Sequence, residues 1–145
     1  MSGKRANCQI RPAQPADADT LFELVGQFAT SFKPERDAYD LCLRELAKDP
    51  SAWLSVADCG GQIAGYCLGF DHFAFFANGR VAWVEEIMVL DAWRRQRIGA
   101  RLMAAFEEWA QSRGAVLVAL ATRRAAAFYR RLGYEESATY FRKLL

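Results

Sequence analysis

Residues 84–103 read VEEIMVLDAWRRQRIGARLM, and this stretch decides more about the fold than any other part of the chain. The run from Val84 to Val89 is apolar apart from two glutamates, which is typical of a strand. A short basic loop, Asp91 to Arg97, follows it. From Ile98 the apolar residues recur every three or four positions, and Gly114 suits the end of a helix. The stretch therefore predicts a strand, a basic loop and a long helix beginning near Ile98.

The start of that helix is suited to binding an anion. The first N–H groups of a helix have no carbonyl partner, and the helix dipole adds positive potential there. Glycine at position 99 has no Cβ to hold a pyrophosphate away from the backbone, and Arg94, Arg95 and Arg97 add positive charge. The alternative is a solvated, arginine-rich helix start that binds nothing. These residues alone leave both interpretations open.

The chain before this stretch predicts one strand, two helices and then strands. Pro12, Pro15, Asp17 and Asp19 favour a turn and a helix start, and the cluster Asp58 to Gly61 favours a hairpin. In chain order we expect a strand at Asn7 to Arg11, a helix through about Phe32, a helix at Glu35 to Ala47, and strands at Trp53 to Ala57, Gln62 to Phe70 and Arg80 to Leu90.

The chain after the long helix predicts a strand, a helix and a strand. Ala115 to Ala121 reads AVLVALA, a continuous apolar run typical of a central strand buried on both faces. A last helix is expected at Arg124 to Leu132, ending at Gly133. Thr139 to Leu145 then supplies a closing strand.

Composition limits the class of protein. The chain has 145 residues, 52% apolar and 25% charged, which predicts one globular domain spanning residues 1–145. A net charge of +2 without an extended Lys/Arg stripe argues against broad nucleic-acid binding. Four cysteines without CxxC spacing and the single His72 predict ordinary thiols, with neither a metal site nor a redox pair. No apolar run follows the two basic residues in Met1 to Ala6, and no later segment reaches ~20 apolar residues, so we expect a cytoplasmic protein without a membrane segment.

Two motifs together resemble a known family. Arg94-x-x-Arg97-x-Gly99, after a strand with a carboxylate, is similar to the acetyl-CoA motif of the GNAT superfamily of N-acetyltransferases. Downstream, ATRRAAAFYRRLGY (residues 121–134) resembles the second cofactor segment of that family, where a helix carries a Phe-Tyr pair and closes on Leu-Gly-Phe/Tyr. Phe128-Tyr129 and Leu132-Gly133-Tyr134 fit that pattern. Two linked motifs at this separation are far more specific than either alone.

The resemblance implies a fold and a cofactor site. The fold is α+β with α/β/α layers: a mixed, mostly antiparallel sheet of six to seven strands and about four helices, splayed at the cofactor slot by a strand bulge. The strand at Ile87 to Val89 pairs its backbone with the pantetheine arm of acetyl-CoA, unless these residues are plain core. The implied cofactor-binding residues are Ile87, Met88, Val89, Arg94, Arg95, Gln96, Arg97, Ile98, Gly99, Ala100, Arg101, Thr122, Ala125, Phe128 and Tyr129.

One residue departs from the family pattern. Arg97 stands where the family usually has its first glycine. An outward-pointing side chain is tolerated there because the family uses main-chain N–H groups, but a required positive φ would cost about 1 kcal/mol. Arg97 is therefore the residue expected to affect the affinity for the cofactor.

Acetyl transfer to an amine needs a base, because a lysine-like amine is mostly protonated at neutral pH. Glu85 and Glu86 lie on the expected strand, and a partly buried glutamate has a raised pKa. Successive strand side chains face opposite ways, so only one is expected to face the slot, and the family pattern favours Glu85. The family often uses the tyrosine matching Tyr129 as the proton donor to the leaving thiolate. Alternatively, Glu85 is a solvated strand-end charge and Tyr129 packs beside Phe128.

The resemblance implies that the acceptor is an amine of a small molecule or a peptide. The loop FDHFAFFANGR, residues 70–80, is expected to wall its site with phenylalanines, with Trp83 beyond and with Asp71 and His72 contacting the amine. The same loop is alternatively core or a contact between the two chains of a homodimer. Three hypotheses remain: an N-acetyltransferase using acetyl-CoA, a non-catalytic acyl-CoA-binding module, and a dimerisation or scaffold protein.

Overall fold

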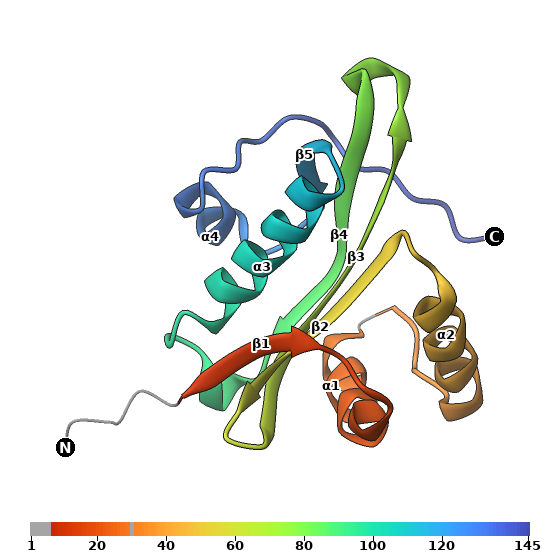
Figure 1. The fold of residues 1–145 in the computed structure, drawn as a ribbon, viewed down its shortest axis with the longest axis vertical. Coiled ribbons are helices and arrows are strands. Elements are labelled where there is room, and N and C mark those ends of the chain that lie inside the picture. The colour runs from red at the N-terminus through yellow and green to blue at the C-terminus, as the bar shows by residue number, and fades with distance from the viewer. Residues whose placement is uncertain (1–6, 30) are drawn as a thin grey trace.

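The computed structural model describes residues 7–29 and 31–145 of the chain and contains one five-stranded sheet. The strands lie in the order β1-β2-β3-β4-β5, so each is next to its neighbour in sequence (Figure 1). The first four are antiparallel, and β5 runs parallel to β4. The strand bounds are β1 Cys8–Pro12, β2 Ala52–Cys59, β3 Gln62–Ala74, β4 Gly79–Val89 and β5 Ala115–Leu120.

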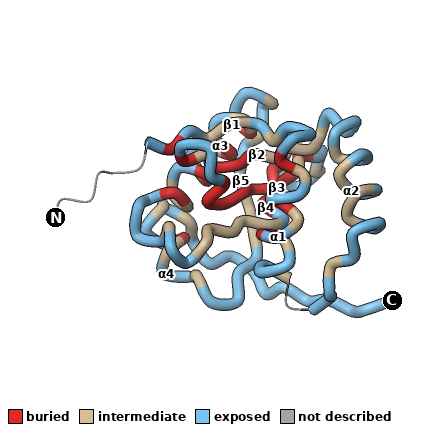
Figure 2. The backbone as a smooth tube through the Cα atoms, turned by 90° about the horizontal axis from the view of Figure 1, so that it is seen from below, coloured by how far each residue is buried: buried red, intermediate tan, exposed pale blue. Residues whose placement is uncertain are grey.

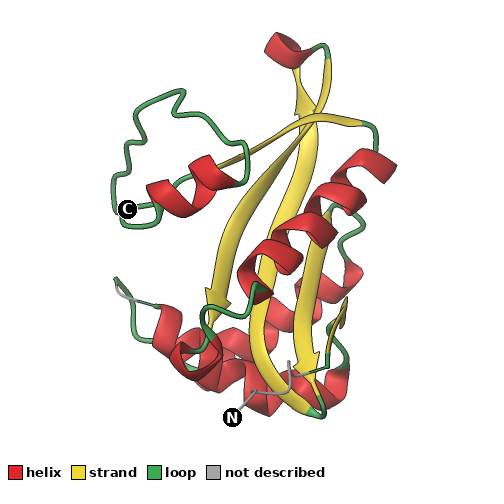
Figure 3. Cartoon of the chain, turned by 90° about the vertical axis from the view of Figure 1, so that its left-hand side faces the viewer, coloured by secondary structure: helices red, strands yellow, loops and turns green. Residues whose placement is uncertain are grey.

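Helices cover both faces of this sheet, which confirms the predicted α/β/α layering (Figures 1 and 3). On one face, α3 packs across β2, β3 and β4; on the other, α1 packs on β3 and α2 on β2. Two separate apolar clusters fill these interfaces, one with α3 and one with α1. The helices are α1 Ala18–Phe28, α2 Arg36–Lys48, α3 Ile98–Ser112 and α4 Ala126–Arg131, with short 3-10 turns at Pro15–Asp17, Phe75–Ala77 and Asp91–Trp93.

Strand alternation assigns the side chains of β4 to the two layers. Ile87 and Val89 pack against the α3-side cluster, whereas Met88 and Leu90 pack against the α1-side cluster. The most deeply buried residues lie on the central strands and on α3, whereas α2 buries none of its residues (Figure 2). The middle of β4 therefore presents groups to both helical layers.

The predicted sheet is larger than the observed one, because the C-terminal residues form no strand. Thr139 to Leu145 has no regular structure and is exposed. Ala115–Leu120 is consequently the edge strand of the sheet, and the prediction that it is central and buried on both faces is wrong: Val116 is 61% exposed and Leu117 37% exposed. An apolar run predicts that a strand is buried. Which strands lie beside it in the sheet depends on residues that are distant in sequence.

The prediction of four free thiols is also wrong. Cys8 of β1 and Cys59 of β2 are directly opposite in the register and form a disulfide. Cys42 is exposed and Cys67 is buried, and both are free. The disulfide joins residues 51 positions apart in sequence, so only the register of the two strands reveals it.

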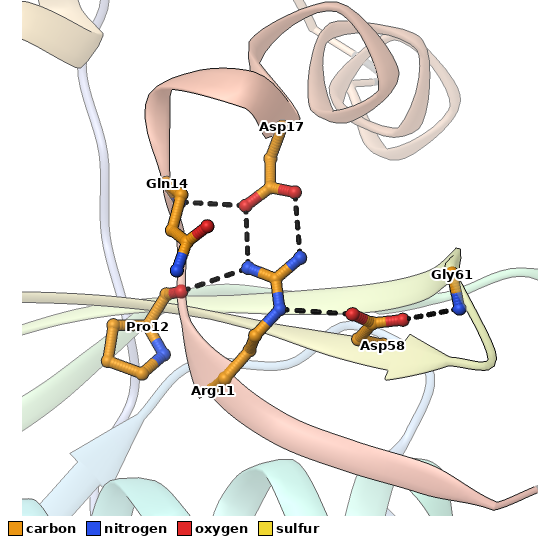
Figure 4. A network of polar contacts seen from close by, with 6 residues as sticks. All are labelled: Arg11, Pro12, Gln14, Asp17, Asp58 and Gly61. Carbon is orange, nitrogen blue, oxygen red and sulfur yellow. Dashed lines mark hydrogen bonds and ion pairs between the residues drawn. The ribbon is translucent and has the colours of Figure 1, made fainter.

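A network of charged side chains fixes the start of α1 against β1 and β2 (Figure 4). The guanidinium of Arg11 donates two hydrogen bonds to Asp17, at 2.8 and 2.9 Å, and one to Asp58, at 3.1 Å. The backbone N–H of Gln14 also donates to Asp17, at 2.7 Å. The bond from Arg11 holds the pKa of Asp17 below its usual value, although burial opposes this. The network orients α1 relative to the sheet.

Among the described residues, no helix combines the length and the apolar composition that crossing a membrane requires.

Candidate active site

The central feature of the site is a break in strand pairing in the middle of β4. Leu68 of β3 is opposite Glu86, while Gly69 is opposite Val84, so Glu85 is an extra residue in β4. Pairing between β4 and β5 ends at Val84 and Leu120. Residues 85–89, which we call the open edge of β4, therefore have no described partner strand on the β5 side. This is the bulge and the splaying that the family resemblance implies.

The basic loop after β4 leads directly into α3. Arg95 and Arg97 have positive φ angles of 65° and 63°, and Arg97 is the N-cap of α3. The left-handed backbone expected from the usual glycine is thus adopted here by an arginine. No side chain caps the helix among the described residues, so the N–H groups of Ile98, Gly99 and Ala100 lack an acceptor there.

The arginines of this region differ in what they contact. Arg94 pairs with Asp91 at 3.1 Å, while Arg95 and Arg97 are exposed and form no ion pair with any described residue. The side chain of Arg101 lies elsewhere: its Nη2 donates to the carbonyl of Cys8 at 2.6 Å. It borders an open depression of about 820 Å³ between β1 and α3, which lies apart from the open edge of β4. Only the backbone of Arg101 remains beside the predicted anion site.

Gly99 has a packing role that the sequence did not indicate. A Cβ at this position would lie 3.2 Å from Cζ of Phe128 and 3.9 Å from Cγ2 of Val89. The glycine therefore lets α4 approach the start of α3 closely, which brings the two predicted cofactor motifs together. Its absent side chain points at Phe128, so the N–H groups of the helix start, rather than the missing Cβ, are the part available to an anion.

The second motif places Tyr129 inside the fold. Thr122 Oγ1 accepts a hydrogen bond from the N–H of Ala125, the N-cap of α4, at 3.1 Å. Tyr129 is buried, with its ring edge-on to Phe128 at 5.0 Å and to Tyr134 at 5.9 Å. Burial raises the pKa of Tyr129 to about 12. Its phenol therefore keeps its proton at neutral pH and can act as a donor.

The two glutamates lie on the same face of the sheet. Trp83 Nε1 donates to Glu85 Oε2 at 2.9 Å, and Tyr66 Oη donates to Glu86 Oε1 at 2.8 Å. Tyr66 belongs to the α1-side cluster, and Trp83 faces the same side because Val84 next to it faces α3. The alternation expected for successive strand residues therefore fails at this point, because the bulge at Glu85 suspends it; which glutamate faces the slot stays a prediction.

Glu86 is the glutamate with the more perturbed environment. It is half-buried, and this burial raises the pKa of its carboxyl group; the nearby charge of Glu85 adds to the rise, and the hydrogen bond from Tyr66 opposes it. The pKa of Tyr66 is also raised, first by burial and then by the charge of Glu86. Glu85 is exposed. Tyr66 was missed because it lies in no motif, and only the β3–β4 register places it opposite Met88 and beside Glu86.

The phenylalanine-rich loop does not lie at this site. It forms the tip of the β3–β4 hairpin, at the top of Figure 1, whereas α3 begins at the lower left. Phe73, Phe75 and Phe76 are exposed there. Asp71 is buried and bound by Arg80 at 2.6 Å and Arg113 at 3.0 Å, so the expectation that it contacts an amine is wrong. Of the predicted acceptor wall, Trp83 contacts a candidate catalytic residue through its hydrogen bond to Glu85.

Comparison with known proteins places this geometry in a class. The chain is 30% identical to the aminoalkylphosphonate N-acetyltransferase of Salmonella typhimurium, over 95% of this chain and 92% of that protein. Its fold matches a structure described as a transcriptional regulator from Bacillus halodurans (25% identity, TM-score 0.86, 96% and 100% of the two chains). It also matches a structure of AAC(6')-Iy in complex with the bisubstrate analogue CoA-S-monomethyl-acetylneamine (20% identity, TM-score 0.79, 96% and 99%).

These findings define an acyltransferase. The Acetyltransferase (GNAT) family profile matches residues 18–134. The chain belongs to the GNAT family of acetyltransferases, enzymes that transfer an acetyl group to an amine. The described residues contain no group of three or more His, Cys, Asp or Glu side chains arranged to hold a metal ion.

Proposed function

We propose that this enzyme transfers an acetyl group directly from acetyl-CoA to a primary amine of a small molecule or a peptide. The observation that carries the proposal is the open edge of β4 beside the uncapped start of α3. An extended pantetheine arm fits the first feature, because unpaired strand groups accept an added strand. A pyrophosphate fits the second, because free N–H groups and the helix dipole favour an anion.

The residues proposed to bind acetyl-CoA fall into three groups. The backbone of Ile87, Met88 and Val89 would bind pantetheine, and the N–H groups from Arg97 to Arg101 would bind pyrophosphate. The side chains of Arg94, Arg95, Gln96 and Arg97 surround the second group. Thr122, Ala125, Phe128 and Tyr129 line the side formed by α4. A solved neighbour of the same fold, AAC(6')-Iy, is described with a coenzyme A bisubstrate analogue, which supports this choice of donor.

In the proposed reaction, Glu86 takes the proton of the acceptor ammonium group, directly or through a water molecule. Its raised pKa favours it over Glu85, and the hydrogen bond from Tyr66 holds its carboxyl group in place; the negative charge of Glu85 would attract the ammonium group. The free amine then forms the new C–N bond at the thioester carbonyl while the C–S bond breaks, and the nitrogen gives up its second proton to solvent. The hydroxyl of Tyr129 gives its proton to the departing thiolate and recovers one from solvent.

The test is a screen of primary amines that follows the release of free coenzyme A from acetyl-CoA. The panel includes an aminoalkylphosphonate, because the Salmonella relative is named for that acceptor. We expect at least one amine to release thiol at a rate that saturates with amine concentration. Binding of acetyl-CoA without thiol release for any amine would favour the non-catalytic binding module. The cytoplasmic location expected from the sequence remains a prediction.

Cofactor binding is tested separately by thermal denaturation. Acetyl-CoA should raise the melting temperature of the native chain, since a ligand that binds only the folded state stabilises it. Arg97→Glu should remove most of that rise by placing a carboxylate beside the pyrophosphate. Arg44→Glu, on the exposed side of α2, is the matched control and should keep the full rise. An equal rise in both variants would refute the placement of the pyrophosphate.

A further inference from the structure

The C-terminal segment, residues 135–145, crosses the α1 side of the sheet without forming a strand (Figure 1). Two contacts hold it there. Tyr140 stacks on Trp83, with ring centroids 6.3 Å apart and planes inclined by 23°. Arg142 Nη1 donates to Ser31 Oγ, in the loop after α1, at 3.0 Å. The segment therefore links the middle of β4 to the end of α1.

Both contacts lead back to the two glutamates. Through Trp83, the Tyr140 contact reaches Glu85, which accepts the indole N–H at 2.9 Å. The Arg142 contact reaches the end of α1, where the ring of Phe28 lies 6.3 Å from that of Tyr66. Tyr66 in turn donates to Glu86. These contacts link the C-terminal segment to both carboxylates, and we call the side chains that make them the circuit.

Charge is unevenly distributed around this circuit. Its aromatic side chains and its two carboxylates all favour a cation such as an ammonium group. Arg142 is the one positively charged member. Its only hydrogen-bond partner among the described residues is the neutral hydroxyl of Ser31, and no described carboxylate lies within 4.0 Å of it.

Arg36 and Arg11 are paired, in contrast to Arg142. Arg36 binds Asp19 and Asp40, and Arg11 binds Asp17 and Asp58. A guanidinium held by a neutral group keeps most of its donors free, in a planar fork that matches carboxylate and phosphate oxygens. The Cα atoms of Tyr140 and Arg142 can be at most about 7 Å apart, so Arg142 belongs to the same short stretch that contacts Trp83 beside Glu85.

We infer that the acceptor is an amine that also carries an anionic group, a carboxylate, phosphate or phosphonate, and that Arg142 and Tyr140 select it. This inference rests on the proposed acetyl transfer. In it, the ammonium end of the acceptor lies at Glu85 and Glu86, the alkyl part lies against Tyr140 and Trp83, and the anionic end binds Arg142. The C-terminal segment is then a specificity element of the active site.

The experiment compares 2-aminoethylphosphonate with its uncharged dimethyl ester, which has the same amine and the same chain length. β-Alanine and its amide form a second pair of probes. We expect the native enzyme to have the higher kcat/KM for the anionic member of each pair. Arg142→Gln should raise KM for the anionic member about tenfold, which is typical of losing a hydrogen bond between charged groups, and should leave KM for acetyl-CoA unchanged.

Lys143→Gln is the matched control, because it removes the same charge one residue further along the exposed segment and should change neither KM. Tyr140→Ala should raise KM for both members of a pair, while Phe141→Ala, at an 86% exposed neighbour, should not. Equal kcat/KM for charged and uncharged amines would overturn the inference, as would equal effects of Arg142→Gln and Lys143→Gln.

If no amine in the panel releases thiol, the proposed function fails, and the inference is then judged by binding alone. Calorimetric titration of 2-aminoethylphosphonate into the chain saturated with coenzyme A should give binding that Arg142→Gln weakens. Binding that is absent, or that is identical in the variant, would overturn it.

Discussion

The two ends of β4 treat charge in opposite ways. Near its first residues, the buried carboxylate of Asp71 is bound by Arg80 at 2.6 Å and by Arg113 at 3.0 Å. Past the bulge, Glu85 and Glu86 are bound only by an indole N–H and a phenol among the described residues. At the first end, the charge of Asp71 is already compensated by the two arginines, without a ligand. The second end, with the uncapped start of α3 beside it, leaves charges for substrates to compensate.

The largest effect on stability should come from removing the carboxylate of Asp71, at the end of β4 where the charges are paired. Burial alone would raise the pKa of Asp71, but the hydrogen bonds from Arg80 and Arg113 outweigh it and hold the pKa below its usual value. Asp71→Ala removes the shared partner of two partly exposed guanidinium groups, and should lower the free energy of unfolding by about 3 kcal/mol in urea titrations. His72→Ala, at the exposed neighbour, is the control and should change little.

The pH dependence of stability follows from the same lowered pKa. Asp71 contributes stability in full above its unfolded pKa, near 3.8, and that contribution is lost as the pH falls through the lower folded value. The native chain and Asp71→Ala should therefore converge in stability toward acid. A constant difference down to the acid limit would show that the loss is one of packing, not charge.

A second prediction concerns the end of β4 that carries Glu85 and Glu86. Glu86→Gln should lower kcat/KM for the acceptor about a hundredfold or more, within the usual range for loss of a general base. Because Glu86 must be ionised to accept a proton, the native rate should fall as the pH drops through its raised pKa. The variant should lack that dependence. Glu85→Gln is the matched comparison, and if it alone abolishes the acid limb, Glu85 is the base.

A third prediction isolates backbone strain at the start of α3. Arg97→Gly and Arg97→Ala remove the same charge, but only glycine adopts the φ of 63° without strain. Arg97→Gly should exceed Arg97→Ala in free energy of unfolding by about 1 kcal/mol. Equal stability of the two variants would mean that the loop adopts another backbone conformation in solution.

The smallest effect is expected at Trp83. Trp83→Phe removes the N–H that binds Glu85 but keeps the aromatic face against Tyr140. Since Glu85 is exposed and water replaces the lost donor, the free energy of unfolding should change by less than about 0.5 kcal/mol. A loss as large as that of Asp71→Ala would erase the contrast between the two ends of β4.

The features predicted from sequence are those encoded locally. The strand, basic loop and helix of residues 84–112 follow from apolar periodicity and from Gly114, and the structure has them. The two predicted cofactor motifs meet at Gly99 and Phe128. The sequence suggested that this glycine makes room for a pyrophosphate, whereas the structure shows that it makes room for Phe128. The roles of the individual site residues remain predictions.

The features missed depend on pairing between distant residues. Thr139 to Leu145 has the composition of a strand but no partner, which leaves β5 at the edge of the sheet. The disulfide of Cys8 and Cys59 and the contact of Tyr66 with Glu86 arise from strand register. The role of Asp71 was misjudged because Arg113, one of its partners, lies 42 residues away in sequence.

The bulge at Glu85 has a consequence for the kinetics of the reaction. It turns both glutamates to the α1 side of the sheet, while the edge proposed for the donor opens toward β5. Two substrates approaching one strand from different directions need not displace each other. Both should occupy the enzyme at once, so double-reciprocal plots at several fixed acceptor concentrations should intersect instead of running parallel.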